Sequence, residues 1–146
     1  MAINSDEQQN AALSWTKAVT KNKEIVAENS NRLIPKGSKL NLKNPPRIKR
    51  KLSAWKGRTD RHAFWLKHNL IKKTLPGEAG KIFDELKMAR AEILGSKEYD
   101  GAKLNIQNFS IDVTKNLADD EIQPVSYTHL RAHETGRNLV CRLLLE

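Results

Sequence analysis

The chain has 146 residues and a formal net charge of +9, with 38% hydrophobic and 29% charged residues. That length suits one ordinary domain with a buried core. No apolar run is long enough for a bilayer-spanning helix, and no signal segment opens the chain. One cysteine excludes an internal disulfide framework and predicts a cytoplasmic location. The charge predicts an acidic partner, which nucleic acid, an anionic membrane or an acidic protein segment would satisfy.

The first predicted element is a helix that begins near residue 5. Ser5 and Gln8 form a capping-box pattern. An apolar stripe of helical period follows at Ala11, Ala12, Trp15, Ala18 and Val19. We therefore expect Trp15 in the core rather than at a contact surface.

Residues 23–50 break this helical period. The segment "EIVAENS" is typical of a short strand, and Pro35 to Ser38 carry a turn signal. Leu40 and Leu42 then alternate with polar residues. A short β-hairpin or an extended arm is therefore expected between the first and second helices.

The segment "RIKRKLSAWKGR" combines six basic residues with Trp55. Such a run is compatible with nucleic-acid binding. The favoured interpretation is a solvated entry into a helix, with Trp55 turned inward.

A second helix is predicted from about Ser53 to Asn69. One face is formed by Leu52, Trp55, Thr59, Ala63 and Leu66. Phe64 and Trp65 project away from that face, so the helix is either sandwiched between other elements or presents aromatics to a partner. The sandwich is favoured, although exposure of these two rings would predict poor solubility of the chain.

The clearest predicted helix lies in "TLPGEAGKIFDELKMARAEILGSK". Pro76 suits its first turn, Glu78 suits the positive end of its dipole, and Gly95 is expected to terminate it. Its expected buried stripe comprises Ile82, Phe83, Leu86, Ala89, Ile93 and Leu94. A further short helix is expected from Gly101 through Phe109, followed by a polar, acidic exit into a linker. The predicted fold is a small, mainly α domain.

The ending "PVSYTHLRAHETGRNLVCRLLLE" differs in character from the rest. His129, His133 and Cys141 are metal-ligand types, and the two histidines are spaced to share one helix face. Back-translation favours another origin, because residues 125–146 resemble two blocks of a sequencing adapter separated by the length of a sample index. The expected division is a native but incomplete domain at 1–123 and an adapter-derived tail, disordered or arbitrary, at 124–146.

Residues 1–123 keep most of the positive charge. Without the three arginines and two glutamates of residues 124–146, 23 basic and 15 acidic residues remain, a net charge of +8. This part has no P-loop, dinucleotide-binding glycine fingerprint, cysteine pair or nucleophile motif. No catalytic or metal-ligating constellation is predicted in it.

Two blocks, "PPRIKRKLSAWKGRTDRHAFWL" and "IFDELKMARAEILGSKEYDGAKLNI", resemble the N-terminal region of the T subunit of aerobic cobaltochelatase. The shared features include Pro45-Pro46, Gly57, Asp60, Ala63, Leu66, Phe83-Asp84, Ala89-Arg90, Glu92, Gly95, Gly101 and Asn105. The resemblance covers residues 45–110 well, and residues 1–44 by general layout.

This resemblance implies a non-catalytic part of an ATP-dependent complex that inserts cobalt into a corrin ring during aerobic cobalamin (vitamin B12) synthesis. The implied partners are an AAA+ ATPase subunit and a large subunit that binds the ring. The complex would use ATP, Mg²⁺ and Co²⁺, with no cofactor held by this chain. The family's T subunit continues into an acidic linker and an integrin-like domain, which agrees with truncation near residue 123.

Interface or framework roles are expected for Arg58, Asp60, Phe64, Trp65, Arg90, Glu92, Gly95 and Gly101. The charged members are equally compatible with salt bridges inside the domain. The two glycines are expected to serve backbone geometry. The alternative function is a basic RNA- or ribosome-associated module, although nucleic acid is not favoured and no membrane partner is expected.

Overall fold

A computed structural model describes residues 4–32 and 34–119. Its four α-helices are α1 (Ser5–Thr20), α2 (Leu52–His68), α3 (Gly77–Glu98) and α4 (Asp100–Asp119). Two short strands, β1 (Val26–Glu28) and β2 (Lys39–Asn41), lie between α1 and α2, and a 3₁₀ turn, η1 (Lys49–Lys51), leads into α2. The mainly α fold expected from the sequence is confirmed.

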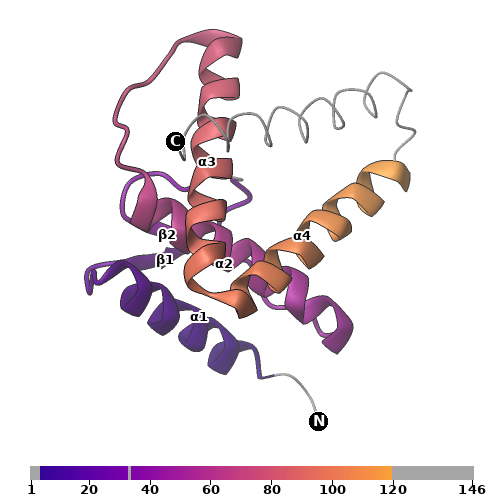
Figure 1. Ribbon diagram of the computed structural model, residues 1–146. Helices are drawn as coiled ribbons and strands as arrows, with labels where there is room; N and C mark the ends of the chain where they lie inside the picture. The colour runs from indigo at the N-terminus through magenta and orange to yellow at the C-terminus, as the bar shows by residue number, and fades with distance from the viewer. Residues whose placement is uncertain (1–3, 33, 120–146) are drawn as a thin grey trace.

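Helix α2 lies at the centre of the domain. The other three helices all pack against it, and α4 makes the most extensive contact (Figure 1). Phe64 is fully buried and Trp65 is 6% exposed, so α2 is sandwiched as expected. The expectation of poor solubility assumed that these two rings were exposed, and the structure removes that reason.

The N-cap of helix α1 lies one residue earlier than predicted. The cap is Asn4, whose side-chain oxygen accepts hydrogen bonds from the backbone N–H groups of Asp6 and Glu7. Ser5 is already helical, so the capping-box prediction for Ser5 and Gln8 is wrong. Asn and Ser are almost equivalent caps, and the sequence offers both in succession.

The two strands fall in the predicted segment, but they pair in parallel and form no hairpin. Val26 pairs with Lys39, and Glu28 with Asn41. A tight turn can only reverse the chain, whereas residues 29–38 cross back so that β2 runs alongside β1 in the same direction. Leu40 and Leu42 of the second strand region are buried, as is Ile25 just before the first.

Helices α3 and α4 form a V that meets near Tyr99 (Figure 1). Gly95 does not terminate α3, which continues to Glu98. Helix α4 runs to Asp119, so it is longer than the predicted short helix and includes residues expected to begin a linker.

The predicted stripe of α3 is largely wrong. Ile82 is 62% exposed, and only Ala89 of the predicted set is buried. The face turned inward instead carries small or polar residues, with Met88 as its one large apolar side chain. Small residues let α3 approach α2 closely, which leaves the bulkier side chains on the flanks of the contact.

Two apolar clusters make up the core. One contains Val19, Phe64, Ala91, Ala102 and Ile106, with Trp15 and Tyr99 packed against it. The other contains Ile25, Leu40, Leu42 and Trp55. The predicted inward positions of Trp15 and Trp55 are therefore confirmed. Tyr99 is 5.0 Å from the Trp15 ring centroid and 6.0 Å from that of Phe64.

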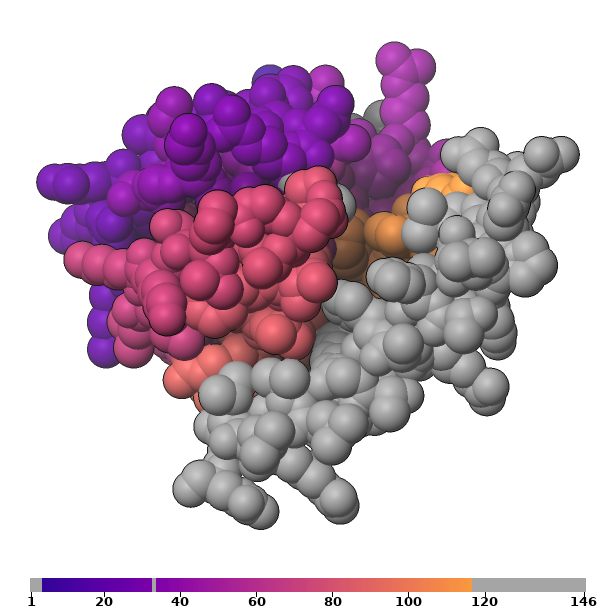
Figure 2. Space-filling view, turned by 90° about the horizontal axis from the view of Figure 1, so that it is seen from above, coloured from indigo at the N-terminus to yellow at the C-terminus, as the bar shows by residue number. Residues whose placement is uncertain are grey.

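Seen from above, α3 and the segment before it (pink) lie beside the N-terminal elements (indigo and purple) (Figure 2). Within the described ranges, no helix has the length and apolar character needed to cross a membrane. The expected tail at 124–146, with His129, His133 and Cys141, lies outside the described residues.

Candidate functional site: the polar residues of the central helix

Helix α2 buries an unusual series of polar side chains. Arg58, Thr59, Asp60 and His62 are all less than 9% exposed. A helix packed on several sides has no solvated face for these groups, so each must find a partner within the domain. Those partners lie on α2 itself, on β2, on α4 and on the segment after β1.

Asp60 belongs to a hydrogen-bonded chain that joins α2 to α4. Asn105 Nδ2 donates to Asp60 Oδ2 at 2.9 Å, and Ser53 Oγ donates to Asn105 Oδ1 at 2.9 Å. Asn108 Nδ2 in turn donates to Ser53 Oγ at 2.9 Å. Burial raises the pKa of Asp60, while the hydrogen bond from Asn105, the nearby Trp15 indole and the charge of Lys56 oppose that rise.

The close approach of α2 and α4 at this point requires a glycine. A β-carbon at Gly57 would lie 1.9 Å from the backbone oxygen of Asn105. Gly57 therefore lets the two backbones meet, and that contact brings the Asn105 side chain to Asp60. Gly57 and Asn105 both carry the sequence resemblance, and neither was among the predicted site residues.

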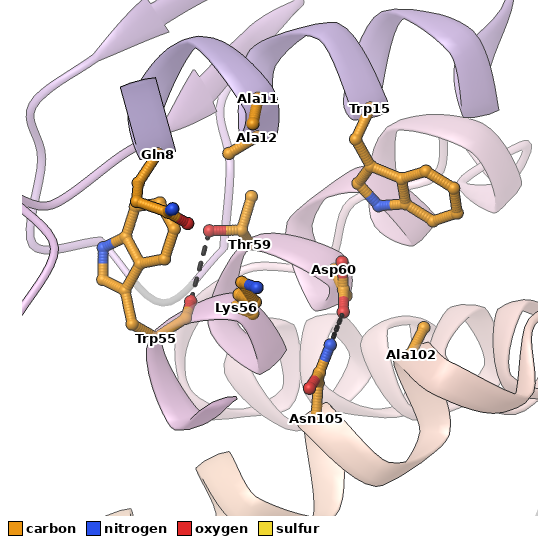
Figure 3. A pocket seen from close by; sticks show the side chains of 10 residues that line it. All are labelled: Gln8, Ala11, Ala12, Trp15, Trp55, Lys56, Thr59, Asp60, Ala102 and Asn105. Atoms are coloured by element: carbon orange, nitrogen blue, oxygen red, sulfur yellow. Dashed lines mark hydrogen bonds between the residues drawn. The ribbon is translucent and has the colours of Figure 1, made fainter. Parts of the chain in front are cut away.

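Asp60 and Asn105 open into a pocket of about 310 Å³ between α1, α2 and α4 (Figure 3). Trp15 and Trp55 stand at opposite ends of this pocket, which we call the tryptophan pocket (Figure 3). Its remaining lining residues are Gln8, Ala11, Ala12, Lys56, Thr59 and Ala102. Apolar walls around a few polar groups are typical of a site that binds a small molecule or a partner's side chain.

An ion pair joins α2 to α3. Arg61 Nε donates to Glu92 Oε1, and Arg61 Nη2 lies 3.4 Å from Glu85 Oε2. The side chains of Arg61 and Glu92 are 12% and 7% exposed. Glu92 is buried although it is an acid, and Arg61 neutralises it inside the domain.

Arg61 is a residue that sequence reasoning missed. Its guanidinium also lies over the Phe109 ring, 5.7 Å from the centroid. The basic residues around it gave no reason to single it out. Its partner Glu92 lies 31 positions later on another helix, and spacing along one helix does not reveal such a pair.

Arg90 acts at the C-terminal end of α2. Its Nη1 donates to the backbone oxygen of His68 at 3.4 Å, a group that the helix itself leaves unpaired. His68 Nε2 lies 3.2 Å from Glu98 Oε1. Burial lowers the pKa of His68, and the charge of Glu98 partly counteracts that effect.

Of the remaining predicted site residues, three pack inside the domain and one is exposed. Phe64 packs against Gly95, and Trp65 lies under the ammonium group of Lys87 at 5.4 Å. Gly101 is exposed, and a β-carbon there would meet no atom within 4 Å. The expected geometric role of Gly101 therefore has no counterpart in its surroundings.

Within residues 4–32 and 34–119, no group of three or more His, Cys, Asp or Glu side chains could hold a metal ion. Comparison of the chain with family models, curated proteins and solved structures finds no match.

Proposed function

We propose that residues 1–123 form a non-catalytic docking domain of a cobaltochelatase T-type subunit. In this proposal the domain takes part in ATP-dependent cobalt insertion into a corrin ring, in the cytoplasm, during aerobic cobalamin synthesis. Cobalt is the substrate, and ATP and Mg²⁺ are held by the AAA+ partner. The large subunit of the complex binds the ring.

The supporting observation is that several residues shared with the cobaltochelatase T subunit lie at contacts between helices. Gly57 and Asp60 contact Asn105, and Gly95 contacts Phe64. These positions lie at the junctions of α2 with α3 and α4. Residues of the pattern that lie at these junctions specify the relative placement of the helices, which is what a docking domain must maintain. Coupling between subunits then depends on differential binding at their contact surfaces.

The tryptophan pocket is the proposed contact with the ATPase subunit. It is open to solvent between three helices, and it combines two tryptophan rings with a buried acid. Aromatic side chains and buried polar anchors are the features that dominate binding energy at protein interfaces.

The test is co-elution of the full chain with the AAA+ subunit of an aerobic cobaltochelatase on size-exclusion chromatography, with ATP and with ADP. We expect co-elution that depends on the nucleotide. Ala11→Arg places a long side chain at the exposed rim of the pocket and should weaken co-elution at least tenfold. Ser14→Arg, also exposed on α1 but not lining the pocket, is the matched control and should bind normally.

Two outcomes would contradict the proposal in different ways. A folded chain that never co-elutes with the ATPase subunit would argue against the cobaltochelatase assignment. Equal binding by the two arginine variants would argue against the tryptophan pocket alone.

One observation favours the alternative of an RNA- or ribosome-associated module. Arg47, Lys49, Arg50 and Lys51 are all exposed immediately before α2. Such a module would be retained on a polyanion, and the logarithm of its affinity would fall linearly with the logarithm of salt concentration. Retention with a slope of several charges, together with failure to bind the ATPase subunit, would favour this alternative.

A further inference from the structure

A second pocket, also of about 310 Å³, lies on another side of α2. It is formed by the chain around Asn31, the segment from Lys43 to Pro46, the first half of α2 and the last turns of α4. We call it the Arg58 pocket, after the buried residue in its lining.

Arg58 is a buried cation without an acidic partner. It is 8% exposed, and its Nη2 donates to the backbone oxygens of Ser30 and Arg32 at 3.0 and 3.1 Å. Its Nε is buried and has no acceptor among residues 4–32 and 34–119. None of the ion pairs formed among the described residues includes Arg58.

Two neutral carbonyls do not compensate a buried guanidinium charge. Removal of a charge from water costs several kcal/mol unless an opposite charge is close. Burial and the nearby charge of Arg61 accordingly lower the pKa of Arg58. The domain therefore holds a positive charge that an anionic ligand would stabilise.

The other charged residues of the pocket add to this positive field. Lys43 and Lys51 also line it, against the single carboxylate of Asp112. Lys51 is the N-cap of α2, and the first turn of that helix has no acidic residue. The positive end of the helix dipole is therefore near the pocket, and no acidic residue of the first turn opposes it.

The rest of the wall combines apolar side chains with Asn31, Asn44 and Asn116. Pro46, Trp55, Phe109 and Val113 contribute side chains beside the charged group. A pocket of this kind discriminates against a fully hydrated inorganic ion, because such an ion cannot use the apolar surface. It suits a ligand that joins an anionic group to an apolar body.

We propose that the Arg58 pocket binds a small organic carboxylate, with the carboxylate beside Arg58 and Lys51 and the apolar part against Phe109 and Val113. Arginine presents donors to a planar carboxylate in a favourable geometry. Trp55 contributes to the walls of both pockets, whereas Arg58 does not line the tryptophan pocket. This proposal does not depend on the cobaltochelatase proposal.

The test is an NMR titration of the full chain with 3-phenylpropionate, monitored at backbone amides around Lys51, Ala54 and Val113. We expect saturable shifts at these positions. The neutral 3-phenylpropanamide should bind at least tenfold more weakly, because it lacks the charge. Inorganic phosphate should also bind at least tenfold more weakly, because it lacks the apolar part.

Three variants and one control locate the effect in the pocket. Lys51→Gln should weaken binding about threefold, and Asp112→Asn should strengthen it about threefold, as expected for single partly exposed charges. Lys56→Gln removes the same charge from the tryptophan-pocket side of α2 and should change nothing. Arg58→Gln should weaken binding about thirtyfold or more.

Arg58 also holds the segment at Ser30 and Arg32, so its replacement can unfold the domain. In that case the Lys51 and Asp112 variants test the proposal. The proposal is overturned if 3-phenylpropionate gives no saturable shifts, if the amide or phosphate binds equally well, or if Lys56→Gln weakens binding as much as Lys51→Gln.

Discussion

Gly95 of α3 lies directly against the ring of Phe64 of α2. A β-carbon at position 95 would come within 2.2 Å of atoms of that ring. Phe64 is fully buried between Val19, Ala91, Ala102 and Ile106, so the ring has no free space into which it could move. The absence of a side chain at position 95 thus sets the distance between α2 and α3.

Gly95→Ala should therefore destabilise the domain by about 2 kcal/mol, in the range for overpacking of a core. Gly101→Ala is the matched control, because its β-carbon would be unobstructed. That change should leave stability unchanged or raise it by up to about 1 kcal/mol, since alanine favours helix formation. Urea denaturation of both variants measures the difference, and equal stabilities would contradict the role of Gly95.

Asp60→Asn should make the stability of the domain less dependent on pH. The pKa of Asp60 is raised in the folded protein, so its contribution is most favourable below the ordinary aspartate pKa. That contribution is lost as the pH rises from the ordinary value through the raised one. Asparagine keeps an acceptor for Asn105 and has no charge to bury.

The measurement is urea denaturation of both proteins between pH 3 and pH 8, in steps of about half a unit. The variant should gain stability relative to the original protein as the pH rises through this window. A constant difference across the range would show that Asp60 has an ordinary pKa.

Arg61→Met should destabilise the domain by about 3 kcal/mol, because it leaves Glu92 buried without its guanidinium. Adding Glu92→Gln should recover part of that loss, since the second change removes the buried negative charge. A double-mutant cycle in chemical denaturation measures the coupling. Lys81→Ala, which breaks an exposed pair with Glu78, is the control and should change stability by less than about 0.5 kcal/mol. Additive effects of the two core changes would contradict the coupling.

His68 should titrate below the ordinary histidine pKa, because burial disfavours its charged form. It therefore stabilises the fold at pH values above the ordinary histidine pKa, and this contribution falls as the pH drops toward the lowered value. Glu98→Gln should lower the pKa of His68 further, since Glu98 favours the protonated ring. NMR titration of the His68 ring protons measures both values. An unchanged or raised pKa in the variant would contradict the assigned role of Glu98.

The sequence predicted the helices better than the contacts between them. The spacing of apolar residues predicted both ends of α2 to within one residue. It also correctly predicted that the Trp55 side chain points inward. The same reasoning failed on α3, because it assumed that the largest apolar residues face the core. The contact with Phe64 instead selects the smallest residue, Gly95, and hydrophobicity does not measure that kind of fit.

Contacts between residues far apart in the sequence explain most of the other differences between the predicted and the observed structure. The parallel register of Val26 with Lys39 depends on how residues 29–38 cross the domain, and local turn signals do not encode it. The Arg61–Glu92 pair and the Asp60–Asn105 bond join different helices. Spacing rules within one helix, such as the i to i+4 relation, cannot find such partners.

The position of α4 at the end of the described chain has a consequence for synthesis on the ribosome. Phe64 is covered by Ala102 and Ile106, and Ser53 is bonded to Asn108, a residue 55 positions later. The central helix is therefore translated well before the element that covers it. Until α4 emerges, the nascent chain holds an aromatic, charged helix that lacks its main packing surface, which is the interval in which chaperone binding or aggregation competes with folding. Helix α4 thus decides when this domain can first become a folded protein.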